Sequence, residues 1–88
     1  MDYAQYILEK TVELLAIDSP TGYTHEAAEW VMKEFNELGF EVTKAVKGGV
    51  IIDFGGKDSQ DGILLEAHAD TLGAMVAEVK SDGRLRML

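Results

Sequence analysis

The sequence contains no cysteine, and this absence excludes both disulfide bonds and cysteine-ligated metal sites. Without thiols the chain can form no disulfide framework and can hold no metal through thiolate ligands. Any metal site must therefore use histidine and carboxylate side chains. Proline is nearly absent too, with Pro20 alone, while 47% of the residues are hydrophobic and 27% are charged. This composition is typical of a globular protein rather than a disordered or fibrous one.

Basic residues are scarce: eight lysines and arginines stand against sixteen aspartates and glutamates, which gives a net charge of -8. Such a chain repels the phosphate backbone of nucleic acids and anionic lipid surfaces. No apolar run approaches the roughly 20 residues that a membrane-spanning helix needs, and the first residues lack the pattern of a secretory signal. We therefore expect a cytoplasmic protein with no nucleic-acid partner and no membrane partner.

The first half of the chain has apolar residues at helical spacing. Residues 2–17 repeat them every three to four positions, and the turn formers of residues 18–22 end this first helix. Thr24 is the expected N-cap of a second helix that runs to about Gly39. Its apolar face consists of Ala27, Ala28, Val31, Met32, Phe35 and Leu38.

After Gly39 the pattern changes to that of strands. A hairpin is predicted around the turn Lys47–Gly49, followed by a buried central strand at Ile63–Ala67 and by a second hairpin that turns at residues 81–83. The fold class is therefore α/β, with two N-terminal helices followed by a mixed β-sheet. The chain ends at Leu88 within a predicted strand, which suggests an incomplete domain.

One short motif, His68-Ala69-Asp70, follows the predicted central strand. Ligands of open α/β sheets bind beyond the carboxyl ends of the strands, where His68 would lie. A histidine that binds a metal also needs an acceptor for its second ring nitrogen, and Asp70 can serve as that acceptor. By itself the motif is a weak pattern, because a lone histidine at the end of a buried strand is more often a hydrogen-bonded structural residue. The other histidine, His25, begins a helix and is interpreted as a solvated residue.

The segment from His68 to Val76 resembles the metal-binding strand of the glutamyl and deblocking aminopeptidases, which are two-metal peptidases of the tetrahedral aminopeptidase type; some members have been labelled endoglucanases. The loop Ser19–Tyr23, the acidic Glu26 and the hairpin with Gly48-Gly49 also resemble the opening elements of this family, in the same order. The resemblance covers nearly all 88 residues. Thr71 stands where many relatives have glutamate.

The resemblance implies an incomplete, N-terminal part of a zinc-peptidase-like α/β domain. In it His68 would be a ligand of zinc or cobalt, and Asp70 the adjacent catalytic residue that orients it. Residues 1–72 would belong to the catalytic domain, and residues 73–88 would lead into an inserted dimerisation domain. The substrates would be peptides, and a homo-oligomer is expected. The remaining ligands and the general base lie beyond these residues in the family, so the isolated chain is expected to be inactive.

Two alternatives remain open. The chain is also compatible with a free-standing, non-catalytic interaction or regulatory module that pairs through an open strand edge. A third interpretation is the related family of peptidases and deacylases that carry Val-Pro after their His-x-Asp motif. Leu72-Gly73 stands in that place and argues against this last assignment.

Overall fold

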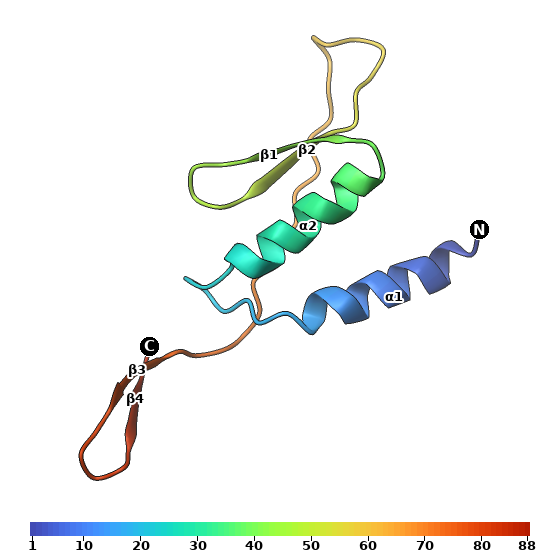
Figure 1. Ribbon diagram of the computed structural model, residues 1–88. Helices are drawn as coiled ribbons and strands as arrows, with labels where there is room; N and C mark the ends of the chain where they lie inside the picture. The colour runs from blue at the N-terminus through green and yellow to red at the C-terminus, as the bar shows by residue number, and fades with distance from the viewer.

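The computed structural model covers residues 1–88 and contains two helices followed by two β-hairpins (Figure 1). The helices are α1 (Tyr3–Leu15) and α2 (His25–Glu37). The strands are β1 (Glu41–Lys44), β2 (Val50–Asp53), β3 (Val76–Val79) and β4 (Leu85–Met87). The predicted α/β class is confirmed, and so is the predicted order of two helices followed by strands.

Both helices begin and end close to where the sequence predicts. The side chain of Asp2 caps α1 by accepting a hydrogen bond from the Gln5 amide at 3.1 Å. Thr24 precedes α2 as expected, although its side chain makes no capping hydrogen bond. Gly39 follows the C-cap of α2 with a φ of 94°, a left-handed conformation that glycine adopts without a Cβ penalty. An ion pair of 2.8 Å between Lys10 Nζ and Glu34 joins the two helices.

The hairpin formed by β1 and β2 lies against α2 (Figure 1). The strands are antiparallel, with Val42 opposite Ile52. Gly48, in the predicted turn, has a φ of 92° and donates its amide to the Ala45 carbonyl at 2.9 Å. Three aromatic rings join helix and hairpin, with neighbouring centroids 4.9 to 6.4 Å apart: Phe35, Phe40 and Phe54. Contact between these rings holds the hairpin on the helix.

The prediction of a central strand at Ile63–Ala67 is wrong. This segment belongs to no strand, and Ile63, Leu64 and Leu65 are 93%, 81% and 84% exposed. In place of one mixed sheet there are two separate two-stranded antiparallel sheets. The apolar run predicts only that the segment favours burial. A strand also requires hydrogen-bonded neighbours, and neither hairpin pairs with this segment.

The second hairpin, β3 and β4, projects away from the helices and forms one end of an elongated molecule of 62 × 32 × 19 Å (Figure 1). Its turn contains Gly83 with a φ of 88°, in the predicted position. Asp82 stabilises the turn, because its carboxylate accepts a hydrogen bond from the Arg84 amide at 3.1 Å and pairs with the Arg84 guanidinium at 2.7 Å. These contacts hold the pKa of Asp82 below its usual value.

Candidate metal-binding site

The loop between the helices crosses the segment that carries the His-x-Asp motif. The Thr71 amide donates a hydrogen bond to the Ser19 carbonyl at 2.9 Å. The hydroxyl of Ser19 donates in turn to the Ala69 carbonyl at 3.1 Å and lies 3.3 Å from the Thr71 hydroxyl. Ser19 is only 1% exposed, and it is the sole buried polar residue. Ser19 therefore fixes the position of the loop relative to the motif, across about 50 residues of sequence.

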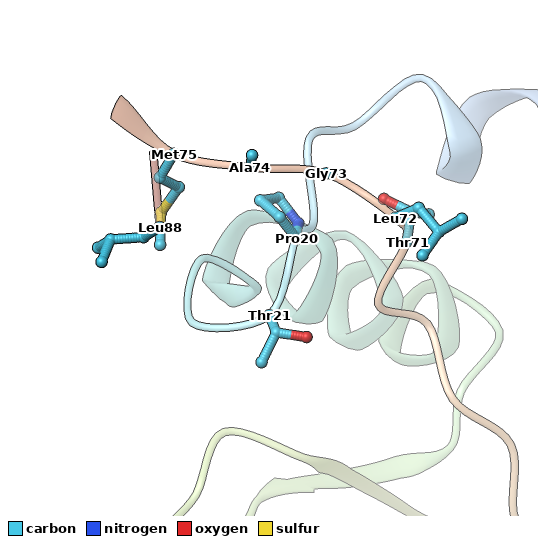
Figure 2. A pocket seen from close by; sticks show the side chains of 8 residues that line it. All are labelled: Pro20, Thr21, Thr71, Leu72, Gly73, Ala74, Met75 and Leu88. Atoms are coloured by element: carbon cyan, nitrogen blue, oxygen red, sulfur yellow. The ribbon is translucent and has the colours of Figure 1, made fainter. Parts of the chain in front are cut away.

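Pro20 and Gly73 approach each other next to this crossing (Figure 2). A Cβ atom added to Gly73 would lie 3.0 Å from the Pro20 Cβ atom, closer than carbon atoms normally approach. Glycine at position 73 thus permits the contact. A shallow hollow of about 320 Å³ opens beside it, lined by Pro20, Thr21, Thr71, Leu72, Gly73, Ala74, Met75 and Leu88.

The structure brings His68 and Asp70 together. The Nδ1 atom of His68 lies 3.1 Å from Asp70 Oδ1 and 3.3 Å from the Asp70 carbonyl oxygen. When Nδ1 carries the ring proton, it donates to this carboxylate and Nε2 keeps its lone pair. The side chain of His68 is 87% exposed, so a ligand can reach the ring from solvent.

A third residue, Thr21, completes the cluster. Its hydroxyl donates a hydrogen bond of 3.2 Å to Asp70 Oδ2, the oxygen that does not face His68. Both oxygens of the Asp70 carboxylate are therefore engaged, one by the imidazole and one by the loop. Sequence reasoning did not select Ser19 or Thr21 as site residues. The available signal was their position in the Ser-Pro-Thr-Gly loop, which was interpreted only as a helix terminator and as part of the family resemblance.

The arrangement suits one metal ligand together with its orienting partner. A metal-bound histidine ordinarily directs its other ring N–H to a carboxylate or carbonyl, as Nδ1 of His68 does here. No three histidine, aspartate or glutamate side chains in the chain lie close enough together to hold an ion. Residues 1–88 thus supply a fitting donor but not a full ligand set.

His25 is exposed, in agreement with its interpretation as a solvated residue. Its ring packs edge-on against Tyr23, with centroids 4.7 Å apart. The Tyr23 hydroxyl donates a hydrogen bond of 3.0 Å to Glu26. This bond and the negative charge of Glu26 raise the pKa of Tyr23. The Tyr23–Glu26 hydrogen bond therefore links the loop to the first turn of α2.

The sequence is similar to that of known peptidases. Residues 48–88, which contain His68, match the sequence profile of the M42 glutamyl aminopeptidases. The chain is 42% identical over 80 residues to "Putative aminopeptidase YhfE" of Bacillus subtilis (strain 168), an alignment that covers 91% of this chain. It is 25% identical over 83 residues, or 93% of its length, to the glutamyl aminopeptidase of Lactococcus lactis subsp. cremoris (strain MG1363).

The predicted resemblance to the glutamyl aminopeptidase family is therefore confirmed, because the family profile matches residues 48–88 and both relatives are similar to nearly the whole chain. It spans 23% of the length of each of the two relatives. No helix of the structure is both long enough and apolar enough to cross a membrane.

Proposed function

We propose that residues 1–88 act within a metal-dependent aminopeptidase, which removes N-terminal residues from peptides by two-metal hydrolysis. The observation that carries this proposal is the contact between His68 Nδ1 and the Asp70 carboxylate, in a segment that matches the M42 profile. The names of the two relatives support the same activity. Peptides are the proposed substrates and a homo-oligomer the proposed assembly.

In this proposal His68 binds one divalent ion through Nε2, and Asp70 orients His68. The Asp70 carboxylate accepts the Nδ1 proton, which fixes the ring tautomer and increases the basicity of Nε2. When bound, a pair of ions polarises the scissile carbonyl and lowers the pKa of a water molecule. Zinc and cobalt are the proposed metals, because both accept imidazole and carboxylate ligands.

The two hairpins fit different parts of such an enzyme. We assign residues 1–72, with both helices and the β1–β2 hairpin, to the catalytic domain. Residues 73–88 form the hairpin that projects from it and would lead into a dimerisation domain (Figure 1). Val79 and Leu85 of this hairpin are 70% and 53% exposed, as expected for a segment that packs on further protein.

As an isolated 88-residue chain the protein is expected to show no turnover. Two-metal hydrolysis needs several ligands for each ion and a base for the water, whereas this chain offers His68 with Asp70. A second candidate function is a non-catalytic interaction module. Residues 63–65 favour it, because they are exposed and pair with no strand, and such an apolar segment can add to the edge of a partner's sheet.

The test compares His68→Ala with His25→Ala in the natural polypeptide that contains these residues. Both histidines are exposed, but only His68 contacts a carboxylate in the candidate site. We expect His68→Ala to lower the zinc or cobalt content, measured by mass spectrometry of the metal, and to abolish hydrolysis of amino-acid p-nitroanilides. His25→Ala should leave both unchanged.

The outcome also separates the two candidate functions. Equal metal content and equal activity in the two variants would remove His68 from the site. A parent polypeptide that neither binds metal nor cleaves these substrates would favour the interaction module.

A further inference from the structure

The Thr21 hydroxyl lies on the far side of the Asp70 carboxylate from His68. Asp70 Oδ1 faces His68 Nδ1 at 3.1 Å, and Asp70 Oδ2 accepts from Thr21 Oγ1 at 3.2 Å. The three side chains thus form a chain of hydrogen bonds from the loop to the imidazole. A carboxylate that is bonded through one oxygen alone can rotate about its Cβ–Cγ bond, and the second bond restricts this rotation.

The loop itself is anchored independently of Thr21. Ser19 binds Ala69 and Thr71 through its backbone and its hydroxyl, and it is 1% exposed. Pro20 packs against Gly73, three residues beyond Asp70 (Figure 2). Ser19 and Pro20, the two residues before Thr21, therefore hold the loop on the motif and on the residues that follow it, and the Thr21 hydroxyl is free to bond to the Asp70 carboxylate.

We propose that Thr21 is a positioning residue, which holds the Asp70 carboxylate in the orientation that fixes the His68 ring for metal binding. This inference rests on the proposed function and deepens it, because it assigns a role in the site to the loop between the helices. The hydroxyl is the active group, so serine should replace threonine and valine should not. Valine keeps the shape and the β-branch of threonine but donates no hydrogen bond.

The experiment measures metal affinity in the natural polypeptide that contains these residues, by competition between the protein and a chelator for cobalt and zinc. Removal of a residue that supports a metal ligand typically weakens metal binding by about 10 to 100-fold. We expect Thr21→Val to weaken binding about 10-fold and Thr21→Ser to remain within about 2-fold of the parent. Thermal unfolding should show equal stability for the two variants.

A second readout needs no metal. The ¹⁵N chemical shifts of the His68 ring in metal-free protein distinguish the Nδ1–H tautomer from the Nε2–H tautomer. The Nδ1–H form should predominate in the parent and in Thr21→Ser, because Asp70 accepts that proton. It should fall in Thr21→Val, in which the carboxylate is less restrained.

The outcomes separate this inference from the proposed function. Metal binding that depends on His68 but is unchanged in Thr21→Val would overturn the role of Thr21 alone. Equal loss of affinity in Thr21→Val and Thr21→Ser, with lowered stability in both, would also overturn it, because loop packing rather than the hydroxyl would then be responsible. A parent that binds no metal through His68 would overturn both proposals.

Discussion

The perturbation that most directly tests the loop crossing is Ser19→Ala, because Ser19 is the only buried polar residue of the chain. The substitution removes the bond from the Ser19 hydroxyl to the Ala69 carbonyl, 3.1 Å long, and the weaker contact with the Thr71 hydroxyl at 3.3 Å. It leaves the backbone hydrogen bond between Thr71 and Ser19 in place. The substitution therefore measures the contribution of the Ser19 hydroxyl separately from that of the backbone hydrogen bond.

The magnitude follows from these contacts. An intramolecular hydrogen bond between neutral groups contributes about 0.5 to 1.5 kcal/mol net to stability. Ala69 is exposed, so water can replace the lost donor at its carbonyl and keep the penalty for an unpaired acceptor small. We expect Ser19→Ala to lower the free energy of unfolding by about 1 kcal/mol, which is near the centre of that range.

The assay is urea unfolding of the natural polypeptide, with Ser81→Ala as the matched control. Ser81 is exposed in the turn of the second hairpin, and its replacement should change the free energy of unfolding by less than about 0.5 kcal/mol. The slope of free energy against urea should be the same for both variants, so that a shift in midpoint reports stability. Unfolding of Ser19→Ala at the same urea concentration as Ser81→Ala would refute the view that Ser19 holds the loop on the motif.

Two further predictions concern the close approach of Pro20 and the turn at Asp82. Gly73→Ala places a methyl group 3.0 Å from the Pro20 Cβ atom and should lower the free energy of unfolding, measured in urea, by about 1 to 3 kcal/mol. Gly62→Ala is the control, because a Cβ atom at position 62 meets no neighbour, and it should leave the free energy of unfolding unchanged. Equal stability of the two variants would contradict the contact between Pro20 and Gly73. The lowered pKa of Asp82 predicts that its pairing with Arg84 stabilises the protein above the unfolded pKa of 3.8, and that this contribution is lost as pH falls through the lower folded pKa. Asp82→Asn should therefore unfold more easily than the parent at pH 6, and the two midpoints should converge toward pH 2; a constant difference would argue against the ion pair.

The sequence alone determined the local structure of this protein. Both helices are predicted from the helical spacing of apolar residues and from the turn formers at residues 18–22. Each predicted end lies within about two residues of the observed one. Glycines that adopt positive φ at positions 39, 48 and 83 mark the end of α2 and both hairpin turns. These features depend on neighbours in the chain, and neighbouring residues are visible in the sequence.

The sequence also predicted the contact between His68 and Asp70 and the resemblance to the glutamyl aminopeptidases, because both follow from residues that are close together in the chain. His68 and Asp70 are two positions apart, and one carboxylate at that spacing is within reach of the imidazole. The similarity to the two relatives extends over nearly the whole chain.

Which segment crosses the motif and which strands pair depend on the folded chain as a whole. Thr21 and Asp70 are 49 residues apart, and no local pattern indicates that their side chains share a hydrogen bond. For the same reason the apolar run at residues 63–67 predicts a buried strand, although no neighbouring strand pairs with it. Pairing and crossing depend on contacts between distant segments, which the periodicity of a single segment does not specify.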